Sequence, residues 1–110
     1  MKINITARHF KIHPTIHDAI VDAVNNLNHF YDGIVSVEVI LSFERIRNSL
    51  KCVELVLYLH GHFLTITEKS EDYLKSLDFA IKKMVRQLVK FKEKQNNHHR
   101  GEPNVIEIKE

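Results

Sequence analysis

The order of hydrophobic and polar residues predicts an α/β protein with four strands and two helices. Two stretches, about 14–30 and 71–94, repeat apolar residues every three or four positions, as an amphipathic helix does. Strict alternation, which indicates a strand with one buried face, occurs over residues 2–8, 35–44, 52–60 and 63–67. The predicted order of elements is therefore β-α-β-β-β-α.

Turn and cap residues stand between these stretches. Pro14 suits the first turn of a helix, because its missing N–H would be unpaired there anyway. Gly33 ends the first helical pattern, residues 45–49 form a polar turn, and Gly61 marks a tight connection between two strands. Ser70 is a good N-cap for the second helix, with two acidic residues directly after it.

Each predicted element has one apolar face, which favours a two-layer α/β sandwich with both helices on one face of a four-stranded mixed sheet. The first β-α-β step is expected to be a right-handed crossover that makes the first two strands parallel. We expect residues 1–95 to form one domain and residues 96–110 to form a flexible C-terminal tail. On the second strand the apolar side is predicted to comprise Val35, Val37, Val39, Leu41 and Phe43. On the second helix the predicted core residues are Leu74, Leu77, Ile81, Met84, Leu88 and Phe91.

Charge is concentrated in one segment, although the net charge is only +2. Residues 69–95 contain 8 Lys and Arg against 4 Asp and Glu, whereas residues 1–68 contain 6 against 7. A concentrated basic segment is typical of proteins that bind a polyanion.

A helical wheel at roughly 100° per residue sorts these cations onto one side of the second helix. The core residues fall in a sector of roughly 180–280°, and the cations fall in a sector of roughly 0–120°. Lysine-rich outer faces also keep many helices solvated, so the stripe alone does not decide the function. Its members are Lys75, Lys82, Lys83, Arg86, Lys90 and Lys94.

If the partner is a nucleic acid, the sequence agrees better with RNA binding than with base-specific DNA recognition. The chain has no helix-turn-helix, zinc-finger or basic-zipper pattern, and its sheet lacks the aromatic motif of an RRM. A basic helix on a three-stranded antiparallel meander resembles a double-stranded-RNA-binding domain, which recognises shape and phosphates. This likeness is at the level of fold only.

Two stretches of sequence are similar to one known family. They are the opening Asn4-Ile5-Thr6 with Ile12-His13-Pro14, and the second helix from Ser70-Glu71-Asp72 to Arg86-Gln87-Leu88 and Lys92-Glu93-Lys94. Over about residues 1–95 the chain resembles the short form of the ribosome hibernation-promoting factor and protein Y family, the ribosome-associated translation inhibitors.

The resemblance implies a function in translational regulation. Members bind the small ribosomal subunit in the channel for mRNA and tRNA, contact its rRNA, inhibit translation and preserve idle ribosomes. A protein of this kind is not an enzyme and needs no cofactor or small-molecule substrate. Carried over to this chain, the rRNA-binding residues are Arg8, Lys75, Lys82, Lys83, Arg86, Lys90, Lys92 and Lys94.

Metal or catalytic chemistry is the first alternative, because the chain has eight histidines. His13 and His17 have a ligand spacing on a helix, but His13 is better placed to cap that helix. Cys52 is predicted on the mixed face of the sheet with no histidine fixed nearby. No Walker motif or GxSxG elbow is present. We therefore expect no metal site.

A protein–protein interaction module is the second alternative. The outer face of the sheet is predicted to carry an apolar set on which copies of the chain would self-associate weakly, although β propensity alone also explains such residues. The start of the chain lacks a signal peptide and no apolar run is long enough for a membrane span. We expect a cytoplasmic protein with no membrane partner. The outer-face set is Ile40, Val56, Tyr58 and Phe63.

Overall fold

A computed structural model describes residues 1–45 and 50–99, with side chains up to residue 94. The predicted order β-α-β-β-β-α is confirmed. A short 3₁₀ helix, η1 (Leu27–His29), follows the first α-helix. The predicted turn at 46–49 and the tail from residue 100 onward lie outside the described residues. The elements are β1 (Lys2–Ala7), α1 (Pro14–Asn26), β2 (Ile34–Glu44), β3 (Leu50–Leu59), β4 (His62–Ser70) and α2 (Tyr73–His99).

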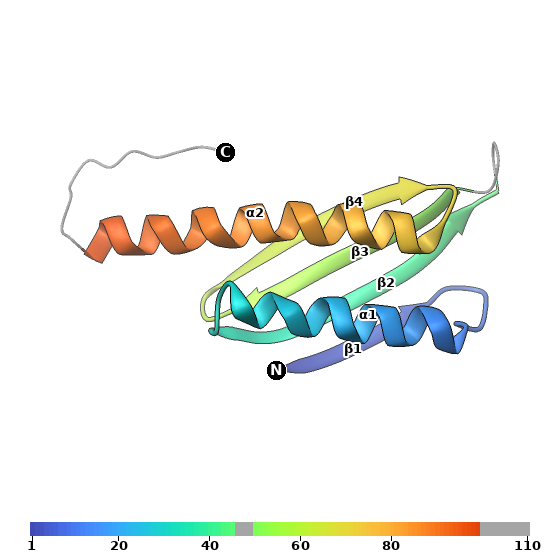
Figure 1. The fold of residues 1–110 in the computed structure, drawn as a ribbon, viewed down its shortest axis with the longest axis horizontal. Helices are drawn as coiled ribbons and strands as arrows, with labels where there is room; N and C mark the ends of the chain where they lie inside the picture. Colours follow the sequence, from blue (N-terminus) through green and yellow to red (C-terminus); the bar gives the residue numbers. More distant parts are fainter. Residues whose placement is uncertain (46–49, 100–110) are drawn as a thin grey trace.

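The four strands form one sheet in the order β1-β2-β3-β4. β1 pairs with β2 in parallel, and β2, β3 and β4 form an antiparallel meander. Both helices cover the same face of this sheet (Figure 1), and α2 lies over β3 and β4. The predicted two-layer arrangement with a mixed sheet is therefore confirmed. Among the described residues, no helix is long and apolar enough to cross a membrane.

The hydrophobic core lies between the helices and the inner face of the sheet. Every second residue of β2 and β3 points into it, as the alternation predicts. From the helices, Ile20, Val24 and one stripe of α2 fill the space above the strands. The α2 stripe has less than a tenth of its surface exposed and consists of Tyr73, Leu77, Ala80, Met84 and Leu88.

The start of β2 departs from the predicted alternation. Val35 was predicted to be buried, but it is 47% exposed, and Ile34 is buried in its place. Ile34 pairs with Leu59 and Ser36 pairs with Tyr58, so one residue of β2 is extra at this point. Such a β-bulge removes one residue from the alternation, and the inner face then resumes at Val37.

The start of α1 is capped as predicted. The Nδ1 atom of His13 accepts a hydrogen bond from the backbone N–H of Thr15 at 3.1 Å, and Pro14 occupies the first turn. The predicted helix over 14–30 is, however, α-helical only to Asn26 and continues as η1. A tightened last turn of this kind is common at the end of a helix.

The N-terminus of α2 is capped by a different residue from the one predicted. The carboxylate of Asp72, not the hydroxyl of Ser70, accepts the backbone N–H of Lys75, at 3.2 Å. Ser70 instead belongs to β4, and its hydroxyl bonds to the backbone of Asp72 and to the buried hydroxyl of Ser76. Asp72 is the better acceptor because its charge also favours the positive end of the helix dipole.

The C-terminal end of α2 lies further along the chain than predicted. The flexible tail is predicted to begin at residue 96, yet the backbone is helical to His99. Asparagine and histidine are weak helix formers but not helix breakers, and the first residue that disfavours a helix strongly is Gly101. The predicted tail therefore begins with the last turn of α2.

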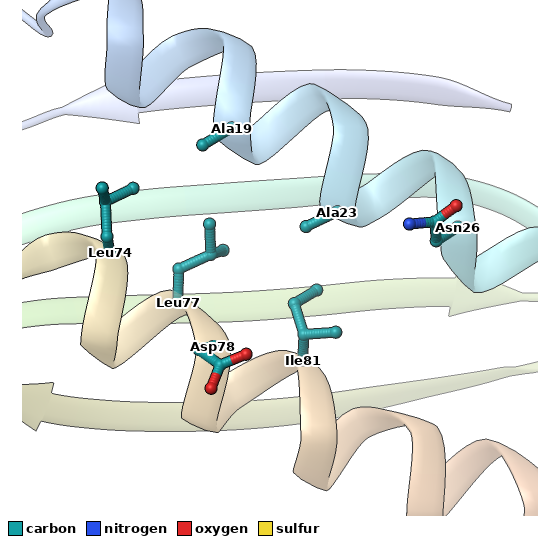
Figure 2. A pocket seen from close by; sticks show the side chains of 7 residues that line it. All are labelled: Ala19, Ala23, Asn26, Leu74, Leu77, Asp78 and Ile81. Carbon is teal, nitrogen blue, oxygen red and sulfur yellow. The ribbon is translucent and has the colours of Figure 1, made fainter.

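Leu74 is predicted to be a core residue, but it is 40% exposed. It lies with Leu77 and Ile81 along a groove of about 330 Å³ between the two helices, opposite Ala19 and Ala23 (Figure 2). The small alanine side chains do not reach across to cover Leu74. Only Asn26 and Asp78 are polar in this groove, so it offers few groups to orient a polar ligand.

Tyr73 attaches the start of α2 to the sheet. Its contribution to stability has two parts, the packing of its ring and the hydrogen bond of its hydroxyl. Its ring stacks on Phe10 with 5.4 Å between centroids, and its hydroxyl donates to the carbonyl of Ser42 at 2.8 Å. We expect Tyr73→Phe to cost about 1 kcal/mol of unfolding free energy, for the hydrogen bond. Tyr73→Ala should cost about 3 kcal/mol or more, because it also leaves a cavity. Urea unfolding measures both values, and equal losses would show that the ring contributes nothing.

Candidate nucleic-acid interface

Most cations of α2 lie on the sides of the helix that do not pack on the sheet, while Lys83 reaches a carboxylate of β4. The buried stripe of α2 packs on β3 and β4, and the helical repeat then directs the predicted basic residues outward. All of them have exposed side chains: Lys75, Lys82, Lys83, Arg86, Lys90, Lys92 and Lys94. The predicted basic face of α2 therefore exists in the folded chain.

The N-terminal half of this face is neutralised by carboxylates on the same helix or just before it. Lys75 Nζ lies 2.9 Å from Glu71 Oε2, and Lys82 Nζ lies 3.1 Å from Asp78 Oδ2. The hydrogen bond between Lys75 and Glu71 raises the pKa of Lys75 and lowers the pKa of Glu71. Both groups of that pair are therefore charged at neutral pH, and the two lysines add little net positive charge.

Lys83 forms the third pair, and its partner lies on the sheet. Its Nζ atom is 2.6 Å from Glu68 Oε2 on β4, and the Glu68 side chain is only 17% exposed. A carboxylate with so little access to water needs a cation nearby. Lys83 therefore serves the attachment of α2 to the edge of the sheet.

The C-terminal half of the face is different. Within the described residues, Arg86, Lys90, Lys92 and Lys94 form no ion pair with a carboxylate. Arg86, Lys90 and Lys94 follow one another at intervals of four residues and so lie along one line of the helix surface. Lys92 is roughly 200° around the helix from Lys90 and faces another direction. We call these four residues the unpaired cations.

The unpaired cations lie where α2 leaves the sheet. Phe91 is the last α2 residue packed on the core. Its ring contacts Tyr31, which precedes β2, and His62, the first residue of β4. Beyond it the helix projects past the strands (Figure 1). A projecting helix is open to solvent on all sides, which explains why Lys92 is exposed although it does not share the line of Arg86.

Arg8 lies far from the unpaired cations. Its backbone N–H bonds to the carbonyl of Leu41, one residue before the carbonyl that accepts the Tyr73 hydroxyl. Arg8 is therefore next to the start of α2. Lys94 is about 30 Å further along that helix at 1.5 Å per residue. One compact ligand cannot contact both ends.

Some of this electrostatic pattern could be found in the sequence. Glu71 with Lys75, and Asp78 with Lys82, stand four residues apart, which is the spacing of a helical ion pair. Glu68 and Lys83 are on different elements, and only the packing of α2 on β4 brings them together.

The structure places the histidines and the cysteine that were considered for metal or catalytic chemistry in other surroundings. Among the described residues, no group of three or more His, Cys, Asp or Glu side chains is arranged to hold a metal ion. Nδ1 of His13 is used in the helix cap, and His17 lies 3.4 Å from Asp18. Cys52 is buried on the outer side of β3, and its register neighbours are Ser42 and Lys69.

The predicted apolar set on the outer sheet face is smaller than expected. Val56 is buried and Ile40 is half-buried, so they offer little surface. Tyr58 and Phe63 are 40% and 64% exposed and face each other across β3 and β4, with 6.3 Å between ring centroids. Self-association through this pair stays a prediction.

The small α/β domain of this chain, with its four strands and two helices, also occurs in solved structures of other proteins. A solved ribosomal subunit interface protein from Coxiella burnetii aligns with a TM-score of 0.78 at 23% identity, covering 86% of this chain and all of that one. The N-terminal domain of Thermus thermophilus Protein Y aligns with a TM-score of 0.73, also at 23% identity, over 83% of this chain and 99% of that one. At this identity the likeness shows the fold.

The sequence comparison shows the family. The profile of the Sigma 54 modulation protein / S30EA ribosomal protein family matches residues 3–96, and this chain belongs to that family. The ribosome hibernation promoting factor of Azotobacter vinelandii is 28% identical over 102 residues, which cover 93% of this chain and 92% of that protein. The factor of the same name from Escherichia coli K12 is 26% identical over 98 residues, covering 89% of this chain and all of that protein. The predicted family is therefore confirmed, while the site residues stay a prediction.

The pair between Lys83 and Glu68 predicts a difference between two neighbouring lysines. We expect Lys83→Ala to lower the unfolding free energy by about 1 kcal/mol, because it leaves the poorly solvated Glu68 without its cation. Lys82→Ala should change it by less than about 0.5 kcal/mol, since both groups of that pair are more than half exposed. Urea unfolding in a Glu68→Gln background is the control, where the cost of Lys83→Ala should vanish. Equal costs for the two lysines would contradict a structural role for Lys83.

Proposed function

We propose that this protein is a ribosome hibernation factor that binds the small ribosomal subunit through rRNA. It occupies the channel for mRNA and tRNA, and so inhibits translation and preserves idle ribosomes in the cytoplasm. Its action is binding and exclusion, without catalysis and without a cofactor. The observation that carries the proposal is the set of unpaired cations in the C-terminal half of α2, which begins at Arg86 and continues onto the projecting end of the helix.

Electrostatics favours this part of α2 as the main contact. A cation that already has a carboxylate partner must give up that interaction, or share it, when it binds a phosphate. The unpaired cations have no such competition within the described residues, so each releases counterions from the RNA at full effect. Their exposure on a projecting helix lets them reach phosphates in a narrow space without a clash from the sheet.

Family membership supports the same partner. The relatives compared above are named for ribosome hibernation, and the solved Coxiella burnetii protein is named for the ribosomal subunit interface. The basic helix supplies the chemistry for contacting RNA phosphates without reading bases. The small subunit and its rRNA are the partner that the resemblance of residues 1–95 implies.

Charge reversal at two unpaired cations tests the proposal. We expect Arg86→Glu with Lys90→Glu to abolish co-sedimentation with purified small ribosomal subunits at low salt, because it removes two phosphate contacts and adds two repulsive charges. The control, Lys2→Glu with Lys69→Glu, makes the same change in net charge on β1 and β4. Circular dichroism checks that both variants fold. If the Arg86 and Lys90 variant pellets as well as the wild type, the proposed interface is wrong.

A second comparison separates paired from unpaired cations. Replacing Arg86 and Lys90 with Gln should weaken binding to small subunits more than replacing Lys75 and Lys82 with Gln. The two variants have the same net charge, but the second removes cations that are already neutralised by Glu71 and Asp78. Binding curves from sedimentation at one moderate salt concentration measure the difference. Equal losses would show that the ion pairs on α2 do not shield their lysines.

A further inference from the structure

One aromatic side chain lies within the basic face of α2. Phe79 is 42% exposed although it is a large apolar residue. On the helical wheel it falls at roughly 60°, between Lys82 and Lys83 and inside the cationic sector of roughly 0–120°. The buried stripe of α2 is on the other side of the helix. Core packing therefore does not explain an aromatic residue at this position.

The Phe79 ring also has no partner within the described part of the chain. The aromatic residues of the described range pair with another ring, except for Phe79 and Phe30. Phe30 ends η1 and is not part of the basic face. The paired aromatic residues are Phe10, Tyr31, Phe43, Tyr58, Phe63, Tyr73 and Phe91.

The ammonium groups of the lysines around Phe79 are held by carboxylates. Lys75 is one turn before it and Lys82 and Lys83 are one turn after it, but their ammonium groups point to Glu71, Asp78 and Glu68. Among the described residues, no cation lies over the Phe79 ring, whereas Arg45 does lie over Phe43. Phe79 thus exposes 42% of its surface among lysines that are paired with carboxylates.

We infer that Phe79 stacks on an unpaired base of the bound RNA, an inference that rests on the proposed function. An aromatic ring beside a phosphate-binding stripe is the arrangement by which proteins hold single-stranded RNA, because every base has a flat face that can stack. The unpaired cations in the C-terminal half of α2 hold the backbone, and Phe79 holds a base about 10 Å nearer the start of the helix, seven residues before Arg86. The basic face therefore binds a region of rRNA that includes at least one unstacked nucleotide.

The contributions of stacking and of charge to the binding affinity differ in their dependence on salt concentration. We expect Phe79→Ala to weaken binding to purified small subunits about 10-fold, which corresponds to ~1.4 kcal/mol. The loss should be the same at every salt concentration, because stacking releases no counterions. Phe79→Tyr should bind like the wild type, whereas Phe79→Leu, which is apolar but has no aromatic face, should behave like Phe79→Ala. The ring is exposed, so these changes should leave the fold intact.

A spectroscopic test identifies what covers the ring. The chain contains three Tyr but no Trp, so Phe79→Trp introduces a single tryptophan, whose emission can be excited selectively. Phe63→Trp on the outer sheet face is the matched control. We expect single-stranded poly(U) to quench the emission of the Phe79→Trp variant, the double-stranded poly(A)·poly(U) to quench it much less, and neither to quench the control. Equal quenching by both RNAs, or no quenching by bound poly(U), would overturn the inference.

The two proposals fail in different ways. If wild type pellets with small subunits but Phe79→Ala pellets equally well, the stacking inference is wrong and the ribosomal function stands. If wild type does not pellet with small subunits at low salt, the proposed function is wrong, and the stacking inference falls with it.

Discussion

The packing of one stripe of α2 on the inner face of β3 and β4 determines most of what this protein can do. Leu77, Ala80, Met84 and Leu88 are buried there, and each large side chain of this kind contributes roughly 1.5–3 kcal/mol when it leaves water. Side chains on a helix keep fixed angles to one another. Burying the stripe therefore sets the rotation of α2 and directs most of its cations toward solvent, while Lys83 reaches Glu68 on β4. Tyr73 at one end and Phe91 at the other fix the position of the helix along the strands.

The basic face that results has two parts with different electrostatic roles. The first part is neutralised by carboxylates, and one of its lysines, Lys83, connects α2 to the edge strand β4. The second part consists of the unpaired cations, which begin at Arg86 and continue past the last core contact at Phe91. The count of cations on a helix thus overstates its attraction for a polyanion, and the pairing of each cation has to be considered first.

Much of the fold followed from the sequence because alternation and helical spacing are local properties. The strand order within the chain, the two helices and their shared face were all predicted. The errors arose where local pattern and tertiary structure differ. The β-bulge at Val35 adds one residue that no repeat reveals. Leu74 has the spacing of a core residue, but the short side chains of Ala19 and Ala23 leave it half uncovered.

The candidate site was predictable to a similar degree. The basic side of α2 and the two ion pairs at four-residue spacing are visible in the sequence. The contact between Lys83 and Glu68 is not, because it depends on how α2 lies over β4. Nor does the sequence place Arg8 at the far end of α2 from Lys94. That position follows from the parallel pairing of β1 with β2.

The salt dependence of the wild-type protein's affinity for purified small ribosomal subunits tests the central claim most directly. With four unpaired cations, a plot of the logarithm of the binding constant against the logarithm of salt concentration should fall with a slope of roughly −3. A slope near zero, or no binding at low salt, would contradict a phosphate-binding role for the projecting end of α2.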